Sequence, residues 1–523
     1  MARKSGNATN LAHPPACGYT PGETPKDNAH MTTTESSTDQ SLVAHLLRRA
    51  AFGGTTQELD HFANLKYEKA VDELLNAQDT KSIPQDVIRR YHIDQSDLRT
   101  RPSSSGNWLY QMVTTNAPFP EKVNLFWHRV FATAQTKLIQ GKAMSTQLDM
   151  LREFGLGKFD ELLLQLSKNP AMLMFLDNQD NHKGSINENY GREILELFSM
   201  GVGNYTEEDI KECSRAFTGW TVENTDYMTL KMRNNTMRPY GYVNWQFKFD
   251  PEDHDDGEKT FLGETGNFNG EDIIALICKN PATAGFVARH LYHYFVADEF
   301  PVPQWPHFEP KDPAAIKVMT DAYFESGYSI KAMLRALFLS DSFKSQASWN
   351  ARVKSPIELI VGTVRLAGGY DGPSQDVYEH ITASGYMGQD IFAPPSVEGW
   401  MGGTDWISTG SMVQRVNFAG SVIGNLDNTG VVALISKIKS DAGSSSSSES
   451  LVRSCLKNLG NLEVSDETLV GLVQFTINAT LRSSTEKIPS ANARPDQNAS
   501  NTSDQAIASL LQLIVSTREY QFV

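Results

Sequence analysis

The sequence has few cysteines and no long apolar run, and each shortage excludes a class of protein. The four cysteines lie far apart, without the paired spacing of a zinc site or a disulfide framework, so we expect reduced thiols at Cys17, Cys213, Cys278 and Cys455. No segment approaches the roughly twenty apolar residues of a membrane span, and the first forty residues hold no apolar core of signal-peptide length. The sequence therefore predicts no membrane span, and a cytoplasmic location is the default expectation.

Basic residues are also in short supply. The chain has 47 Lys and Arg against 62 Asp and Glu, which gives a formal net charge of −15. Proteins that bind nucleic acid or anionic membrane surfaces present a basic footprint. The charge balance therefore argues against both kinds of partner.

Several familiar catalytic motifs are missing as well. The sequence contains no Gly-x-Ser-x-Gly elbow and no HExxH pair, and "GETGNFNGEDI" lacks the Gly-Lys-Ser/Thr ending of a P-loop. His290 and His293 lie one helical turn apart in "ARHLYHYF". We interpret them as interior or aromatic-stacked residues rather than zinc ligands.

Apolar residues instead recur at helical spacing through most of the chain, and strand-like alternation is scarce. In "SLVAHLLRRAAFGG" a Ser precedes an apolar run that closes on Gly53 and Gly54, which predicts a short capped helix starting near Ser41. We predict a mainly α fold, a multi-helical globular array with little β structure. Two long loop insertions rich in Gly, Pro and Trp interrupt it at residues 224–269 and 385–406, and loops of this length tend to carry function.

Composition divides the chain into three parts. Residues 1–40 are rich in Pro, Gly, Asn, Ser and Thr, which predicts a disordered extension. Residues 41–424 are expected to form the main helical domain. Residues 425–523 are expected to form a helical C-terminal segment with flexible linkers near 441–450 and 486–505, and its final stretch "QAIASLLQLIVSTREYQFV" is expected to pack back onto the main body.

The stretch "INENYGREILELFSM" predicts an amphipathic helix with one charged side. At about 100° per residue, its charged residues share one side of the helix and its apolar residues take the other; the charged set is Glu188, Arg192, Glu193 and Glu196. This pattern is typical of a solvated surface helix. The same cluster can also bind a metal, hold a proton at a shifted pKa or clamp a partner. Asn-rich connections before and after the helix could fold over its charged side, which favours a site.

Two histidines lie beside polar residues. In "FPEKVNLFWHRVFAT" the helical spacing puts His128 next to Asn124 at the edge of an apolar face, where a histidine is either structural or a ligand or base. The acidic stretch "FDPEDHDDGEKTFLG" contains His254 and Asp255; it fails the EF-hand pattern and is either a surface turn or part of a cation site. We predict a divalent metal ion as the candidate cofactor, with His128, Glu193, His254 and Asp255 as its ligands.

These segments, taken in order, resemble a bacterial family. The set "HLLRRAAFG", "FWHRVFAT", "NPAMLMFLDN", "NENYGREILELFSMGVGNYTEEDIKECSRAFTGW", "VKSPIELIVGTVR" and "MGQDIFAPPSVEGWMGGTDWI" resembles the family called domain of unknown function eighteen hundred over residues 41–420. The closing "STREYQF" resembles the last helix of that family. The resemblance implies a mainly helical protein without an assigned activity.

The resemblance also implies a partner and further site residues. Genes of this family often lie beside those of the family called domain of unknown function fifteen hundred and one, which resembles sulfatases and alkaline phosphatases and often carries a twin-arginine export signal. Carried over position by position, the family motifs and the second loop imply binding residues at Arg48, Arg215, Trp220, Lys259, Gln389, Trp400 and Trp406. Gly191 stands where the family usually has Ala.

Two functional interpretations remain open. The first is an enzyme-like charged site that acts together with the sulfatase/phosphatase-like partner. Arg192 would hold an anionic group there, and the ligands or acid/base groups would be His128, Glu188, Glu193 and Glu196. The second is a non-catalytic binding or assembly companion of the same partner. In either case we expect export only together with a partner that carries a signal.

Overall fold

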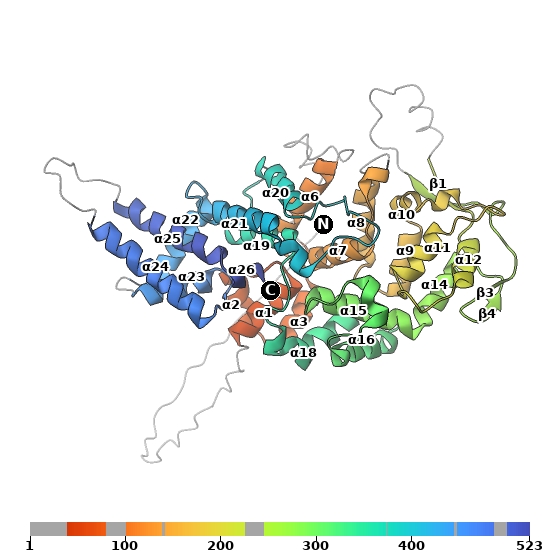
Figure 1. Ribbon diagram of the computed structural model, residues 1–523, viewed down its shortest axis with the longest axis horizontal. Coiled ribbons are helices and arrows are strands. Elements are labelled where there is room, and N and C mark those ends of the chain that lie inside the picture. Colours follow the sequence, from red (N-terminus) through yellow and green to blue (C-terminus); the bar gives the residue numbers. More distant parts are fainter. Residues whose placement is uncertain are drawn as a thin grey trace, which may run out of the picture. The chain divides into compact units, whose positions relative to one another are not determined.

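The computed structural model describes residues 39–79, 101–138, 142–224, 245–372, 374–443, 447–485 and 499–523. Residues 37–523 form one compact unit. The described chain is mainly helical, as predicted (Figure 1). The helices are α1 (Gln40–Ala50), α2 (Thr56–Ala63), α3 (Tyr67–Asn76), α6 (Arg101–Thr114), α7 (Pro118–Val130), α8 (Lys142–Phe154), α9 (Phe159–Ser167), α10 (Pro170–Phe175), α11 (Asn189–Glu196), α12 (Glu207–Ala216), α14 (Gly270–Lys279), α15 (Pro281–Phe295), α16 (Pro313–Glu325), α17 (Ile330–Leu339), α18 (Asp341–Lys344), α19 (Pro356–Leu366), α20 (Asp376–Tyr386), α21 (Thr409–Ile423), α22 (Thr429–Ala442), α23 (Ser448–Asn458), α24 (Asp466–Thr485), α25 (Ala499–Val515) and α26 (Arg518–Gln521). Short 3-10 helices are η1 (Gln135–Lys137), η2 (Asn178–Asp180), η3 (Val302–His307), η4 (Gln346–Ser348) and η5 (Gly403–Ile407).

The strands form two small antiparallel pairs. β1 (Trp220–Glu223) pairs with β2 (Gln246–Phe249), and β3 (Lys259–Phe261) pairs with β4 (Glu264–Gly266). β2, β3 and β4 fall inside the first predicted insertion, of which residues 225–244 lie outside the described chain. The second insertion is irregular between the end of α20 and η5, as predicted.

Helix α1 begins slightly earlier than its sequence suggests. The cap is Asp39 rather than Ser41, since the Asp39 carboxylate accepts a hydrogen bond from the Ser41 N–H at 2.9 Å. A carboxylate satisfies a free N–H of the first turn and interacts favourably with the helix dipole, so the helix starts at Gln40. Gly53, just past its end, has a φ of 90°, which favours glycine.

The core is one continuous set of buried apolar side chains. Val123, Phe126 and Trp127 of α7 are at most 2% exposed. Phe126 packs against Phe295 of α15 with ring centroids 5.9 Å apart, and Phe295 packs against Phe338 of α17 at 5.7 Å. These aromatic contacts fix the last turn of α7 against α15, where the site described below lies.

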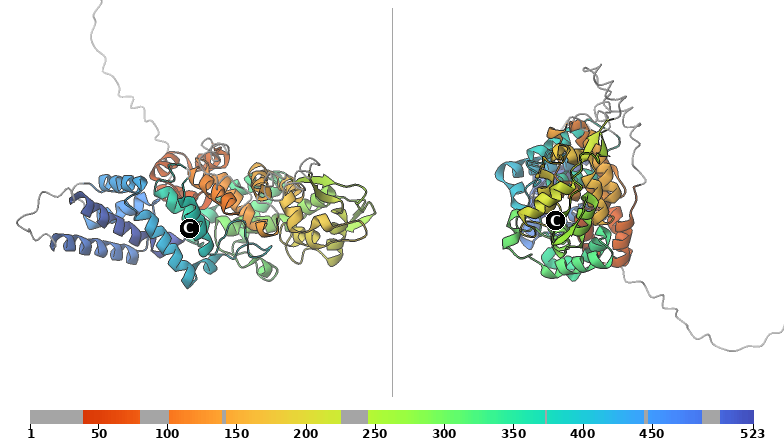
Figure 2. Two further views of the ribbon diagram at one scale, coloured as in Figure 1. Left: turned by 90° about the horizontal axis from the view of Figure 1, so that it is seen from above. Right: turned by 90° about the vertical axis from the view of Figure 1, so that its right-hand side faces the viewer.

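The C-terminal helices pack onto the rest of the unit. Helix α25 lies along α21, and α21 lies along α19. Phe522 forms an antiparallel bridge with Val353, and the Tyr520 hydroxyl lies 2.8 Å from the Thr363 hydroxyl. Within residues 37–523, Figures 1 and 2 show α22–α25 at one end and β1–β4 at the other.

Some predicted segments lie partly or wholly outside the described residues. These are residues 1–38 of the expected N-terminal extension, residues 444–446 of the first linker and residues 486–498 of the second. The described remainder of both linkers consists mostly of helix ends, because α22 ends at Ala442, α23 begins at Ser448 and α25 begins at Ala499.

The described cysteines are isolated thiols inside the core. Cys213, Cys278 and Cys455 are free and buried, in keeping with the expected reduced state, while Cys17 lies outside the described chain. Burial raises the pKa of all three thiols above their ordinary value. None of the helices in the described ranges is both long and apolar enough to cross a bilayer.

Candidate functional site

A cavity of about 480 Å³ lies among the end of α7, α15, the segment 296–303 and the second loop insertion. Its volume falls within the range of small-molecule sites. Its apolar lining includes Phe300, Pro301, Pro303, Pro395, Trp400 and Met401, and its charged or titratable lining consists of Arg129, His290, His293, Asp298, Glu299, Glu398 and Asp405. An apolar surface with a few polar groups is typical of a ligand site.

Three side chains, which we call the basic wall, line one part of this cavity: Arg129, His290 and His293. Arg129 belongs to the last turn of α7, and the two histidines lie three residues apart on α15, hence on one face of that helix. Arg129 Nη2 lies 2.6 Å from His293 Nε2. The packing of α7 on α15 therefore brings all three together.

The contacts of His293 leave an excess of hydrogen-bond donors. Its Nδ1 lies 2.8 Å from the backbone N–H of Glu299, and its Nε2 faces the Arg129 guanidinium. Both neighbours are donors, whereas a neutral imidazole has one donor and one acceptor nitrogen. Burial, then Arg129, hold the pKa of His293 well below its ordinary value, and the ring is neutral; a second ring proton would only add another donor. One N–H group beside the cavity is left without an acceptor.

His290 lacks a partner in the same place. It packs against Phe286 and Trp305 with ring centroids 4.5 and 4.6 Å apart, as expected for an aromatic-stacked residue. Its Nε2 is buried and has no hydrogen-bond partner among the described residues. Burial, then Arg129 and Arg289, lower the pKa of His290 to about 3, so the ring is neutral at physiological pH.

The acidic lining residues differ in how far they are neutralised. Glu299 is buried and paired with Arg289, Oε2 to Nη2, at 2.9 Å. Asp298 accepts a hydrogen bond from the Val353 N–H at 3.1 Å, and burial raises its pKa. Glu398 and Asp405 are exposed, and we call them the acidic rim. The cavity thus joins a partly buried basic wall to an exposed acidic rim.

A buried ion network interacts electrostatically with Asp298 through Arg352 and Arg49. Glu358 of α19 accepts from Lys122 and from both terminal nitrogens of Arg352, and all three side chains are nearly inaccessible. Although burial raises it, Arg352 and Lys122 hold the pKa of Glu358 below its ordinary value. Arg49 adds a buried guanidinium whose Nε and Nη1 have no partner among the described residues. Cations therefore outnumber carboxylates in this network, and the charges of Arg352 and Arg49 reach Asp298 on the cavity lining, where both act to lower its pKa after burial has raised it.

Several of the predicted residues meet at this cavity. Trp400 lines it, and Trp406 lies beneath the Arg129 guanidinium at 5.9 Å from the ring centroid. His128 lies behind Trp400, with ring centroids 5.1 Å apart. It is fully buried rather than half-buried, its Nε2 accepts from the Phe392 N–H at 3.3 Å, and burial lowers its pKa to about 3. His128 therefore acts as a neutral support for the cavity wall.

The charged helix forms as predicted and borders the cavity at one end. It is α11, with Tyr190, Ile194 and Leu195 buried, and Leu197 at its C-terminus lines the cavity. Burial, then the charges of Glu196 and of rim residue Glu398, raise the pKa of Glu193 to about 7. This carboxyl group can exchange a proton near neutral pH.

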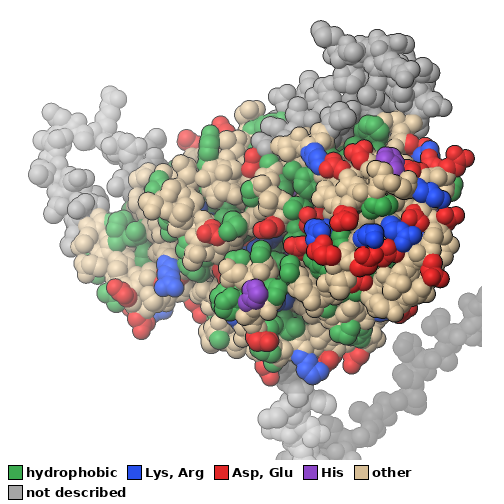
Figure 3. Space-filling model, turned by 45° about the vertical axis from the view of Figure 1, so that its right-hand side comes forward, with side chains coloured by type: hydrophobic (Ala, Val, Ile, Leu, Met, Phe, Trp, Pro, Cys, Tyr) green, Lys and Arg blue, Asp and Glu red, His purple; other side chains and the backbone are tan. Residues whose placement is uncertain are grey.

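The remaining charges of this helix form surface contacts. Arg192 pairs with Glu207 of α12 at 2.8 Å and with Glu188 at 3.6 Å, and Glu196 accepts from the Tyr205 hydroxyl at 3.2 Å. In Figure 3 the right-hand side of Figure 1 comes forward, and acidic and basic side chains lie interleaved on the face that it shows.

The residues predicted around His254 form a separate cluster that fastens β3 to α12. Arg215 binds Asp255 through Nε at 2.8 Å, and this hydrogen bond lowers the pKa of Asp255 to about 2. Lys259 Nζ donates to the backbone oxygens of Asp255 and Gly257 at 2.5 and 3.0 Å, and His254 Nδ1 lies 2.8 Å from the Thr218 oxygen. Each of these charged groups is occupied by a structural contact.

Two predicted binding residues lie in the interior. Trp220 is 1% exposed, with Lys168 Nζ 5.3 Å from its ring centroid. Gln389 is 2% exposed, and its Oε1 accepts from the N–H of Ile357 in the first turn of α19 at 3.0 Å. Gln389 thereby attaches the second loop insertion to α19.

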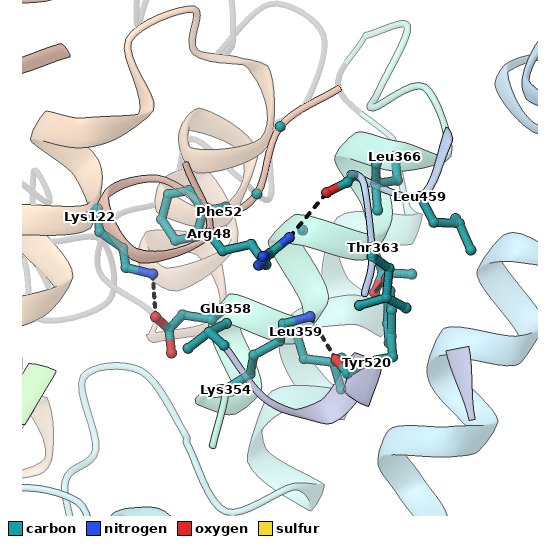
Figure 4. A pocket seen from close by; sticks show the side chains of 16 residues that line it. Arg48, Phe52, Lys122, Lys354, Glu358, Leu359, Thr363, Leu366, Leu459 and Tyr520 are labelled. Carbon is teal, nitrogen blue, oxygen red and sulfur yellow. Dashed lines mark hydrogen bonds and ion pairs between the residues drawn. The ribbon is translucent and has the colours of Figure 1, made fainter. Parts of the chain in front are cut away.

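Arg48 lines a second, much smaller cavity of about 30 Å³, drawn in Figure 4. Its Nη1 donates to the Gly460 oxygen at 3.2 Å, and Lys354 Nζ donates to the Tyr520 oxygen at 2.6 Å. This volume suits a water molecule and is too small for an organic ligand. Burial, then Arg48, lower the pKa of Lys354 to about 7. Arg48 therefore serves packing between α1 and the loop after α23.

The predicted metal ligands are not gathered in one place. Within the described ranges there is no group of three or more His, Cys, Asp or Glu side chains that could hold a metal ion. His128 is enclosed by aromatic rings, whereas His254 and Asp255 belong to the β3 cluster.

Sequence reasoning missed Arg129 and Asp298. Arg129 follows His128 directly in "FWHR", and the helical spacing that put His128 toward the core left Arg129 without a role. The available signal was the pair His290 and His293, whose side chains share one face of α15.

Comparison with known protein families gives a match over most of the chain. The sequence model of a family described as "Protein of unknown function (DUF1800)" matches residues 45–522. No curated protein and no solved structure matches the chain.

Proposed function

Because the chain belongs to the DUF1800 family, whose description names no activity, we propose from the geometry that its 480 Å³ cavity is an enzyme-like small-molecule site. The observation that carries the proposal is the composition of the cavity wall. Trp400, Phe300 and their apolar neighbours supply area for binding, while Arg129 and His293 supply oriented polar groups. Burial, then the charges of Glu196 and rim residue Glu398, raise the pKa of Glu193 to about 7, and this carboxyl group lies on α11, whose C-cap Leu197 lines the cavity, which supports proton transfer near it.

Blocking the cavity tests this proposal. Ser396 lines it from an exposed position, so Ser396→Trp fills the space with little disturbance of the core. Ser436 is exposed on α22, and Ser436→Trp is the matched control. We expect a small-molecule library, screened by saturation-transfer NMR, to yield ligands that bind the wild type and Ser436→Trp but not Ser396→Trp. Equal binding to all three proteins would refute the proposal.

We further propose that the site acts together with the sulfatase/phosphatase-like partner implied by the family resemblance. Turnover of the cavity ligands would then require both proteins. The turnover rate of the wild type would change with pH about the raised pKa of Glu193, about 7, and Glu193→Gln would remove this pH dependence. If the chain is exported, its export would depend on the partner. Fractionation of cells with and without the partner gene measures this dependence, and an unchanged distribution would remove that part of the proposal.

A second candidate function is that of a non-catalytic companion. Exposed apolar side chains near the cavity favour it: Phe300 and Phe308 are 38% and 44% exposed and stack at 4.3 Å, and Met401 is 58% exposed. Aromatic residues and methionine are enriched at interfaces. Phe300→Ser with Met401→Ser would weaken association with the partner in a pull-down, whereas Val470→Ser on α24, 68% exposed, would not. Retention by the double variant would exclude this surface.

A further inference from the structure

We propose that Arg129, His293 and His290 bind an oxyanion group, a phosphate, sulfate or carboxylate, of the ligand that enters the cavity. This inference rests on the proposed function and names the ligand class for the same site. It starts from the unequal numbers of donors and acceptors at the basic wall.

The donors exceed the acceptors in number. His293 has a donor opposite each ring nitrogen, and one of the two contacts must join donor to donor. Arg129 forms no ion pair with a carboxylate among the described residues, and its Nη2 lies within hydrogen-bond distance of His293 Nε2, which is itself a donor when Nδ1 accepts from the Glu299 N–H. His290 adds a buried Nε2 without a partner, which is a further donor when the ring carries its proton on that nitrogen. Buried donors without acceptors cost free energy, and an anion bound among them would satisfy them.

Space for the anion is kept open by a glycine. A Cβ built on Gly402 would lie 2.8 Å from Arg129 Nη2 and 3.7 Å from His293 Nε2. The absence of a side chain at Gly402 therefore leaves the region beside both donors free.

The surrounding charges also favour an anion. The cations near Arg129 include Arg352. Burial, then the charge of Arg352, lower the pKa of Arg129, and the same two causes in the same order lower the pKa of Arg49. Glu299 is neutralised by Arg289. Asp298 is the nearby carboxylate that remains, and burial raises its pKa.

The acidic rim restricts the rest of the ligand. Glu398 and Asp405 are exposed carboxylates on the cavity lining, and they repel a second negative charge. The ligand therefore carries its oxyanion at one end, against the basic wall, and a hydroxyl-bearing or cationic part at the rim. Trp400 and Phe300 contact the apolar surface between the two.

Calorimetric titration with four small probes tests the inference. The anions are phenyl phosphate, phenyl sulfate and benzoate, and benzyl alcohol is the neutral analogue. We expect at least one anion to bind wild-type protein ten times more tightly than benzyl alcohol, and the order among the three identifies the oxyanion. Arg129→Gln, and Gly402→Ala, which places a methyl group beside the donors without changing charge, would each weaken that anion at least tenfold. Arg453→Gln, which alters an exposed arginine paired with Glu449 on α23, would leave binding unchanged.

The outcomes separate this inference from the proposed function. If benzyl alcohol binds as tightly as the anions, and Ser396→Trp abolishes its binding, the cavity is a ligand site but the oxyanion assignment is wrong. If no probe binds, or if Arg129→Gln and Gly402→Ala both bind the anions like wild type, the assignment is also wrong. If an anion binds and Ser396→Trp does not affect it, both proposals fail. Circular dichroism of each variant establishes that it is folded.

Discussion

Glu358 combines three structural roles at one position. It is the N3 residue of a capping box with Ser355 at the start of α19, and it pairs with Lys122 from α7 and Arg352 from the preceding loop. Its side chain is 2% exposed. One carboxylate therefore compensates the charges of two buried cations.

The Glu358→Gln variant removes that charge and retains the shape. A buried pair that loses one partner leaves an uncompensated ion, which typically costs about 3–5 kcal/mol. We expect a loss of this size in the free energy of unfolding, measured by urea denaturation. The control is Glu68→Gln: Glu68 is 66% exposed and pairs with Arg335, so its loss should cost less than about 1 kcal/mol. Similar losses in the two variants would contradict the role assigned to Glu358.

Glu193 makes stability depend on pH in the opposite sense from a paired carboxylate. Its ordinary pKa of 4.5 rises to about 7 in the folded protein, through burial and the charges of Glu196 and Glu398, against Arg192. Below pH 4.5 the group is protonated in both the folded and the unfolded state. Between pH 4.5 and 7 the unfolded chain releases the proton first, so the folded state loses relative stability, and above pH 7 the loss is complete.

The Glu193→Gln variant should therefore gain stability relative to wild type as the pH rises from 5 to 8. Urea midpoints at both pH values measure the difference, and Glu196→Gln is the neighbouring comparison. A difference that is the same at both pH values would contradict the raised pKa.

At the scale of residues, the sequence predicted which positions are charged but not how each charge is used. The amphipathic pattern gave α11 its charged side, yet Arg192 pairs with Glu207 of another helix. The donors of the basic wall are brought together by the packing of α7 on α15, two helices separated by 150 residues of chain. The helical periodicity of each segment does not predict which other helix it packs against.

At the scale of elements, Gly191 determines how closely α11 approaches α12. A Cβ built there would lie 2.0 Å from Ser214 Oγ, and Ser214 is fully buried, donating to the Ile210 oxygen at 2.8 Å. The family resemblance places Ala at this position, and Ala favours helix over Gly by about 1 kcal/mol. Here the contact with Ser214 outweighs that preference.

We therefore expect Gly191→Ala to lower the free energy of unfolding by about 1–3 kcal/mol, the usual cost of overpacking. Ser214→Ala removes the hydroxyl that the new methyl group would meet. The double variant should recover part of the loss, so a thermodynamic cycle on the four proteins should give a coupling energy of opposite sign to the loss. Additive effects would show that the helices move apart instead.

Most helices and the irregular second insertion could be predicted from apolar periodicity and Gly/Pro content, because those signals are local. The strands β2, β3 and β4 could not, since each is three or four residues long and is held by its partner strand. The start of α1 was misplaced because Asp39 precedes Ser41 and competes with it as a cap.

At the scale of the whole molecule, the end of the chain supports the cavity. Val353, Trp400 and Trp406 form a small apolar cluster against which Phe522 packs, and Phe522 also pairs with Val353 through the backbone. Trp400 lines the cavity. The second insertion is therefore held in place by residues more than a hundred positions further along the chain.

We expect Phe522→Ala to increase hydrogen exchange in peptides from residues 395–406 and to weaken ligand binding in the cavity. The control is Leu513→Ala on α25, a residue 37% exposed outside this cluster. Mass spectrometry of the exchanged protein measures both variants. Unchanged exchange of residues 395–406 in Phe522→Ala would mean that the apolar cluster does not hold the loop.

The buried cysteines provide a means of timing such openings. Cys213 lies in α12, Cys278 in α14 and Cys455 in α23, so the three thiols report on different parts of the unit. Only the thiolate reacts rapidly with alkylating reagents, and burial suppresses both its formation and its access. In a Cys17→Ser background, the rate at which each thiol is alkylated therefore measures how often its own region opens. The order in which the three thiols are labelled gives the order in which the three regions unfold.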